Sequence, residues 1–164
     1  MGKKMVIGVS FVAGMLGVLG GRAAVNRIVE KKEDKNDTGV LKFKSQFYML
    51  NRWLQLEQQG KTIAEYLEDN GYHKIAIYGM GSMGERIIDD LKKTKVEIAF
   101  GIDEKADARL SEECSIYSLE DCVDKNADVI VVSAIFAYQD IKAKIESYGI
   151  QIPIISLEDV IYSM

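Results

Sequence analysis

The sequence has few of the residues that build metal centres, disulfides and acid–base sites. Its 164 residues include two cysteines and one histidine. Cys114 and Cys122 lack zinc-ligand spacing, and His73 lies far from both in sequence. We therefore expect no metal site, and two free thiols in a reducing compartment.

The common catalytic signatures are also missing. The chain has no Ser/His/Asp set, no HExxH motif and no phosphate-binding lysine after its glycines. Tyr138 and Lys142 form a YxxxK pair like that of short-chain dehydrogenases, but the pair follows the fourth expected strand, where those enzymes do not place it. We interpret it as a chance match, and His73 as a surface or packing residue.

The chain has no excess of positive charge. Its formal net charge is −4, and Lys3, Lys4 and Arg22 all lie in the first 25 residues, which hold no carboxylate. The remainder is therefore more acidic than the whole, and nucleic acid is not expected as a partner. With 48% hydrophobic and 28% charged residues, one packed globular domain without disulfides is expected.

A dinucleotide-binding fingerprint is the strongest pattern present. An apolar run over 75–78 leads into Gly79-Met80-Gly81-Ser82-Met83-Gly84, a complete GxGxxG turn. In such a turn the first glycine permits the tight bend, the second lets the backbone approach a pyrophosphate, and the third lets the next helix pack closely. A helix beginning near Ser82 would direct its N–H groups and positive dipole end at the phosphates.

Asp103 completes the fingerprint at the end of a second apolar run, over 96–102. A carboxylate there can accept hydrogen bonds from both ribose hydroxyls and would repel a 2′-phosphate, which favours NAD over NADP. A methyltransferase is disfavoured, because Tyr78 stands where such enzymes usually carry a carboxylate. The glycines could instead serve only the turn and helix packing, in a domain without this ligand.

The N-terminal segment predicts a membrane anchor. Residues 5–21 are 17 uncharged residues between Lys3-Lys4 and Arg22. As a helix they would be about 25 Å long, somewhat less than the roughly 30 Å of a hydrocarbon core. Snorkelling of the flanking cations would make up the difference. A signal peptide or a soluble helix is the alternative, and Arg22 in the would-be cleavage region argues against the first. The larger number of basic residues after the span favours a single-pass protein with a cytoplasmic body. Gly17 and Gly21 form a GxxxG pair that would suit a homodimer.

The remaining chain is expected to divide into three parts after the anchor at 1–25. Residues 26–39 are a charged linker. Residues 40–72 form a helical pair: apolar positions recur at helical spacing from Phe43 to Leu56, and Thr62 to Glu65 is a capping box. Residues 73–164 form a small Rossmann-like α/β domain.

That domain is expected to hold a five-stranded parallel sheet in the order 3-2-1-4-5. Further strands are predicted at 116–117, 128–133 and 152–155, with Pro153 marking an edge or strand start, and helices at 118–121, 141–148 and from Ser156 onward. The ligand crevice would lie at the carboxyl ends of the strands. We expect it to be lined by Gly79, Met80, Gly81, Ser82, Met83, Gly84, Asp103, Ser133 and Ala134.

Three segments together resemble short bacterial Rossmann-type proteins associated with surface-polysaccharide biosynthesis. They lie at 47–54 with Gly60-Lys61 following, at 75–81 and at 154–160, and the resemblance covers about residues 43–164. It implies a membrane-associated role near nucleotide-sugar chemistry and supplies no catalytic residues.

The leading hypothesis is a membrane-tethered module that binds NAD or a nucleotide-sugar in a cell-envelope polysaccharide pathway and is not catalytic on its own. One alternative is an NAD-dependent sugar epimerase or dehydrogenase completed by a polysaccharide-biosynthesis partner or by a dimer. Another is an interaction domain with a vestigial nucleotide pocket.

Overall fold

A computed structural model describes residues 39–106 and 111–164. The chain forms two compact units, Met1–Gln46 and Phe47–Met164. Of the first unit only residues 39–46 are described, and they are helical. The predicted membrane anchor at 5–21, its GxxxG pair and the linker up to residue 38 lie outside the described residues. Within the described part, no helix is long and apolar enough to cross a membrane.

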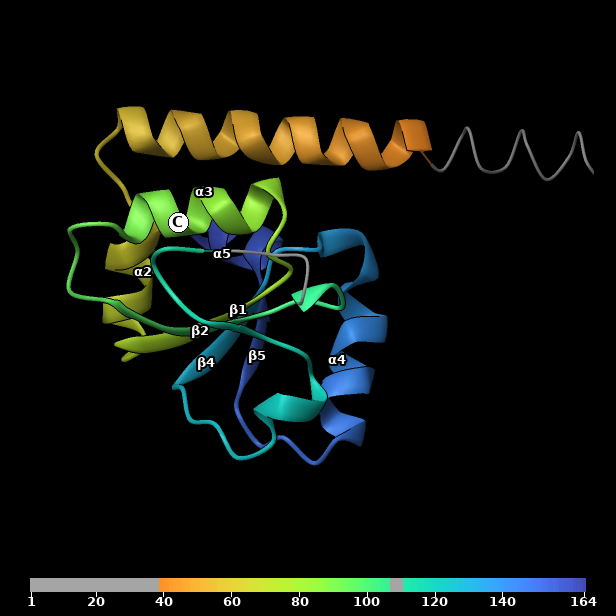
Figure 1. The fold of residues 1–164 in the computed structure, drawn as a ribbon. Coiled ribbons are helices and arrows are strands. Elements are labelled where there is room, and N and C mark those ends of the chain that lie inside the picture. Colours follow the sequence, from red (N-terminus) through yellow and green to blue (C-terminus); the bar gives the residue numbers. More distant parts are fainter. Residues whose placement is uncertain (1–38, 107–110) are drawn as a thin grey trace, which may run out of the picture. The chain divides into compact units, whose positions relative to one another are not determined.

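The second unit is an α/β fold built on a five-stranded parallel sheet (Figure 1). Its strand order, β3-β2-β1-β4-β5, confirms the predicted topology. All four neighbouring pairs are parallel. The strands are β1 (Lys74–Tyr78), β2 (Glu97–Ile102), β3 (Ile116–Tyr117), β4 (Val129–Val132) and β5 (Ile154–Ser156).

Two hydrophobic cores lie on opposite faces of the sheet. On one face, Ile75 and Ile77 of β1 pack with the helical residues 47–58, α2 (Ile63–Asp69), α3 (Ser82–Leu91) and α5 (Leu157–Ser163). On the other face, Ala76 and Tyr78 pack with α4 (Tyr138–Ser147) and the 3-10 helix η2 (Glu120–Cys122). The alternation along β1 follows from the two-residue period of a strand. All four residues of β4 are buried, as the β-branched run predicts for an inner strand.

Local signals placed most helix ends correctly. Thr62 and Glu65 form the predicted capping box of α2, and Ser156 caps α5. Pro153 directly precedes the edge strand β5, as predicted.

Several boundaries differ from the predictions, and β4 is one residue shorter at each end than the predicted 128–133. The crossover helix begins at Tyr138, three residues early, after an unpredicted 3-10 turn η3 (Ile135–Ala137). The strand expected at 152–155 lies at Ile154–Ser156. The helix expected at 118–121 is the three-residue η2, and Ser118 makes the expected local contacts: its Oγ donates to the Asp121 carboxylate at 2.6 Å and accepts the Asp121 N–H at 3.4 Å.

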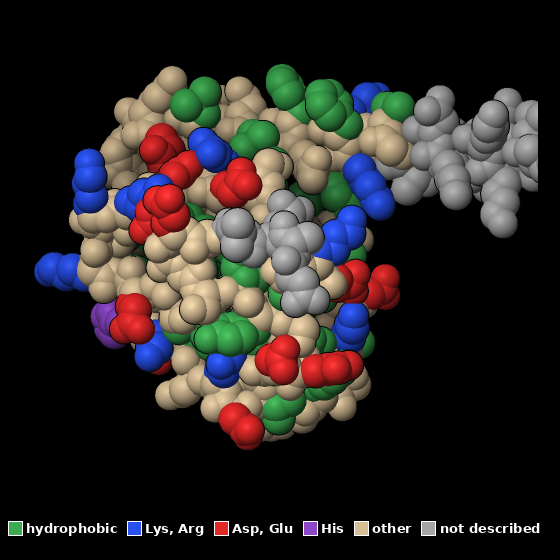
Figure 2. Space-filling model, viewed as in Figure 1, with side chains coloured by type: hydrophobic (Ala, Val, Ile, Leu, Met, Phe, Trp, Pro, Cys, Tyr) green, Lys and Arg blue, Asp and Glu red, His purple; other side chains and the backbone are tan. Residues whose placement is uncertain are grey.

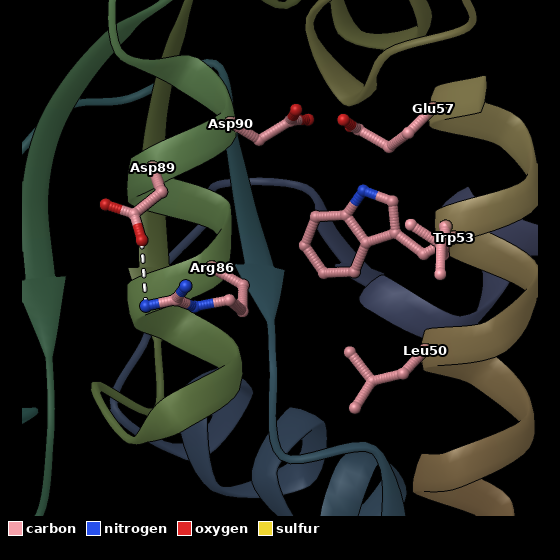
Figure 3. A pocket seen from close by; sticks show the side chains of 7 residues that line it. Leu50, Trp53, Glu57, Arg86, Asp89 and Asp90 are labelled. Atoms are coloured by element: carbon pink, nitrogen blue, oxygen red, sulfur yellow. Dashed lines mark ion pairs between the residues drawn. The ribbon is translucent and has the colours of Figure 1, made fainter. Parts of the chain in front are cut away.

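The helical residues 47–58 join the first core through buried Met49, Trp53 and Leu56. Beside this contact, Asp90 of α3 and Glu57 point toward one another (Figure 3). Asp90 Oδ2 also accepts the Ile63 N–H at 3.1 Å, which ties α3 to the start of α2. Burial raises the pKa of Asp90 to about 7, helped by the hydrogen bond and the charge of Glu57.

This raised pKa predicts that folding stability falls as pH rises. Between about pH 4 and 7 the folded chain keeps the Asp90 proton that the unfolded chain has lost, so the stability present at low pH is lost as pH passes the folded pKa. Asp90→Asn, which mimics the protonated acid, should raise the free energy of unfolding at about pH 8 by about 1–2 kcal/mol, allowing for the half-exposed site.

Urea denaturation of both chains near pH 4.5 and pH 8 measures this difference, which should largely disappear at the lower pH. Asp89→Asn is the matched control, because Asp89 is an exposed neighbour held in surface ion pairs. An equal effect of Asp90→Asn at both pH values would contradict the assignment.

Candidate functional site

The carboxyl ends of β1, β2 and β4 bring the predicted site residues to one edge of the sheet. Gly79 follows β1, Asp103 follows β2, and Ser133 follows β4. The amide of Gly79 donates to the Ile102 carbonyl at 2.8 Å, and the amide of Ser133 donates to the Tyr78 carbonyl at 2.9 Å. All nine predicted residues therefore lie on or beside the turn from β1 into α3.

Gly79 bends the chain out of the sheet in a conformation that only glycine adopts easily. Its φ is +93°. A Cβ there would lie 2.7 Å from Ser133 Oγ and 3.5 Å from the Ala134 amide. The Ser133 hydroxyl donates to the Gly79 carbonyl at 2.6 Å, so the end of β4 fixes the turn.

Gly84 allows α3 to lie directly against the turn. A Cβ on Gly84 would lie 2.3 Å from the Gly79 carbonyl oxygen. The expected role of the third glycine, close packing of helix on strand, matches this geometry.

Gly81 is different, because its backbone does not need a glycine. It is the N-cap of α3 with φ −83° and ψ −164°, an extended conformation open to any residue. No side chain caps this helix, in contrast to α2 and α5. The first turn of α3, beginning with Ser82 and Met83, thus lies at the carboxyl edge of the sheet with no capping side chain on its N-cap residue.

Asp103 supports the glycine turn, a role that the fingerprint did not reveal. Its Oδ2 accepts the Met80 N–H at 2.9 Å, and its Oδ1 accepts the Lys105 N–H at 2.9 Å. Through these two bonds the carboxylate holds both the glycine turn and the start of the segment that follows β2. The bond to Lys105 is the two-residue pattern of an Asx turn, which the sequence could have indicated.

Met80 does not face the crevice. Its side chain is buried and packs over Gly101 of β2, where a Cβ would lie 2.7 Å from Met80 Sδ. Gly101 is therefore a residue that the sequence reasoning missed. It makes space for the second residue of the turn.

A hollow of about 250 Å³ lies next to Asp103. Lys144 and Glu104 form an ion pair there at 2.8 Å, and the Tyr148 hydroxyl donates to Glu120 at 3.2 Å. Burial raises the pKa of the Tyr78 hydroxyl, which Lys144 lowers in part. No motif marked this hollow, because its residues come from separate segments. Its lining consists of Tyr78, Ile102, Asp103, Glu104, Ser118, Leu119, Glu120, Lys144 and Tyr148.

The other candidate groups have structural partners. The Tyr138 hydroxyl donates to the Ile154 carbonyl at 3.1 Å, which attaches α4 to β5. His73 is exposed, and its amide donates to Asp128 at 2.8 Å. Cys114 and Cys122 are free thiols, and burial raises the pKa of Cys122 to about 11. Among residues 39–106 and 111–164, no group of histidine, cysteine and acidic side chains could hold a metal ion.

The model of the C2185-like N-terminal family matches residues 71–155. The chain belongs to this family. In the C2185-like domain the matched residues run from just before β1 to the second residue of β5, so they include the glycine turn, Asp103 and the hollow beside it. No curated protein matches the chain. No solved structure matches it either.

Changing Gly84 or Gly81 to alanine should have clearly different effects on the free energy of unfolding. Gly84→Ala should lower the free energy of unfolding by about 1–3 kcal/mol, because the added methyl overlaps the Gly79 carbonyl. Gly81→Ala should cost less than about 1 kcal/mol, because its φ and ψ suit alanine. Urea denaturation of the two variants measures the difference, and equal losses would show that the turn geometry is wrong.

Proposed function

We propose that this chain is a membrane-tethered, Rossmann-like module that binds NAD or a nucleotide-sugar in a cell-envelope polysaccharide pathway, and that it does not catalyse a reaction alone. The observation that carries the binding proposal is the start of α3. There, a glycine turn held by Ser133 and Asp103 places an uncapped helix N-terminus at the carboxyl edge of a parallel sheet.

The described residues fit the parts of a nucleotide. Phosphates suit the N–H groups at the start of α3, which carries no side-chain cap. A ribose suits the position of Asp103, a carboxylate that lies directly after β2 beside the glycine turn. The hollow beside Asp103 lies where the base of a nucleotide would bind. The negative charges of Glu104 and Glu120 make this hollow unsuited to phosphate.

The pathway and the tether rest on the sequence. The resemblance at 47–54, 75–81 and 154–160 supports a role near surface-polysaccharide biosynthesis, and the apolar segment at 5–21 supports the anchor with a cytoplasmic body. A polysaccharide-biosynthesis enzyme is the partner class that such a module would serve.

One observation favours the interaction-domain alternative. The Met80 amide already has Asp103 as its acceptor, and the Met80 side chain is buried. The turn is therefore fully supported without a ligand.

Thermal denaturation with added ligands tests the proposal. A ligand that binds only the folded state stabilises it by about 2.7 kcal/mol at 100 times its dissociation constant. NAD or a nucleotide-sugar should raise the melting temperature, and NADP should raise it less than NAD, because Asp103 repels a 2′-phosphate. S-adenosylmethionine serves as a nucleoside control.

Gly81→Ala should abolish this shift while the variant stays folded, because its methyl group would meet a bound pyrophosphate. Ser115→Ala is the matched control: it is an exposed position that precedes β3 and lies away from the carboxyl edge. No shift with any ligand would favour the interaction domain. Reduction of bound NAD by a nucleotide-sugar would instead identify an enzyme.

A further inference from the structure

A second hollow, of about 370 Å³, lies between the helical residues 50–57 and α3 (Figure 3). All of its lining residues belong to the second unit, and its volume is within the range of small-ligand pockets, roughly 300–1,000 Å³. We call it the Trp53 hollow. It is lined by Leu50, Trp53, Leu54, Glu57, Arg86, Asp89 and Asp90.

Trp53 brings a polar group to this hollow that has no partner in the described part of the chain. The residue is only 5% exposed, because its ring packs in the first core. Among residues 39–106 and 111–164, no group accepts its indole N–H. Every described side-chain nitrogen or oxygen that is closed to solvent does have a partner, so this N–H must be open to the hollow. Because a buried indole N–H normally has an acceptor, its position indicates a ligand that can supply one.

Two carboxyl groups face the same space. Figure 3 shows the nitrogen edge of the Trp53 indole turned toward the ends of Glu57 and Asp90, which point toward one another. Asp90 Oδ2 also accepts the Ile63 N–H at 3.1 Å, and this bond holds its carboxyl group in place. The hollow therefore offers one N–H donor and two carboxyl groups to a single ligand.

These groups favour a ligand with several hydroxyls. An ammonium group could donate to the carboxylates but could not accept the Trp53 N–H, and the carboxylates would repel an anion. A trans peptide group both donates and accepts, but its N–H and C=O point in opposite directions. A hydroxyl can accept the indole N–H and donate to a carboxylate from the same side. A sugar carries such hydroxyls on neighbouring carbons.

The remaining lining suits the rest of a sugar ring. Leu50 is 38% exposed and Leu54 is 56% exposed, and Figure 2 shows hydrophobic side chains on the surface of this helix. The C–H face of a sugar ring is apolar, so covering these leucines would remove apolar surface from water. Arg86 is exposed and is held by Asp89 at 2.8 Å, where its other N–H groups can donate to further hydroxyls.

We propose that the Trp53 hollow is a binding site for a sugar. The indole N–H donates to one hydroxyl, and neighbouring hydroxyls donate to Glu57 and Asp90. The C–H face of the ring covers the two leucines. This site is separate from the nucleotide crevice, because none of its lining residues lies in the glycine turn at 79–84. The proposal therefore holds whether or not the crevice binds NAD.

Trp53 itself reports on the hollow, because it is the one tryptophan of the chain. The full chain is titrated with glucose, galactose, mannose and N-acetylglucosamine in a zwitterionic detergent that has no sugar headgroup. At least one sugar should change the Trp53 fluorescence saturably and should move the single indole N–H resonance in the NMR spectrum. Ethylammonium chloride and sodium acetate, as the cation and anion controls, should do neither.

Two outcomes of this titration would overturn the proposal. A saturable response to ethylammonium with none to the sugars would identify a cation site. A folded chain that responds to none of the four sugars would show that another segment covers the hollow or that it takes up only water.

Two conservative variants test the contacts by calorimetry with the sugar that binds. Trp53→Phe keeps an aromatic ring in the core but removes the N–H, so it should weaken binding about three- to tenfold. Glu57→Gln keeps the shape but loses the charged acceptor, so it should weaken binding about tenfold. Glu146→Gln is the matched control and should bind like the unchanged chain, because this exposed glutamate lies on α4, on the other face of the sheet. Equal affinities of all three variants, each folded by circular dichroism, would overturn the site.

Discussion

The fold of the candidate site depends on one close contact, the approach of Gly84 to the carbonyl of Gly79. A Cβ on Gly84 would lie 2.3 Å from that oxygen, and the same oxygen accepts the Ser133 hydroxyl. The end of β1, the start of α3 and the end of β4 therefore meet at one carbonyl group. Because α3 also packs Ile87, Ile88 and Leu91 into the first core, its position at the sheet edge follows from this contact.

The sequence predicted this architecture because its signals are local. Three features can be recognised in the sequence itself. They are a glycine that needs a positive φ, a glycine that needs space, and the two-residue period of a strand. The topology followed from the predicted strands and helices, because right-handed crossovers leave few arrangements for five parallel strands. The capping residues Thr62 and Ser156 are equally local, and both helix starts were placed correctly.

The partners of the site residues could not be predicted in this way, because they depend on segments that are distant in sequence. Asp103 was expected to face a ribose, yet it holds the Met80 amide 23 positions away. Ser133 was expected as a lining residue, yet its hydroxyl fixes the Gly79 carbonyl. Gly101 lies within a regular strand, so the sequence does not indicate that a Cβ there would meet the Met80 side chain. The hollow beside Asp103 is likewise assembled from four separate segments.

Helix α3 connects the candidate site to the rest of the second unit. Its first residues, Gly81 to Met83, border the crevice, whereas Arg86, Asp89 and Asp90 line a separate hollow beside Glu57. Asp90 accepts the first amide of α2, so α2 is attached to the same helix. Because Gly84 allows α3 to lie directly against the glycine turn, the position of the crevice and the position of α2 both depend on the packing of this one helix.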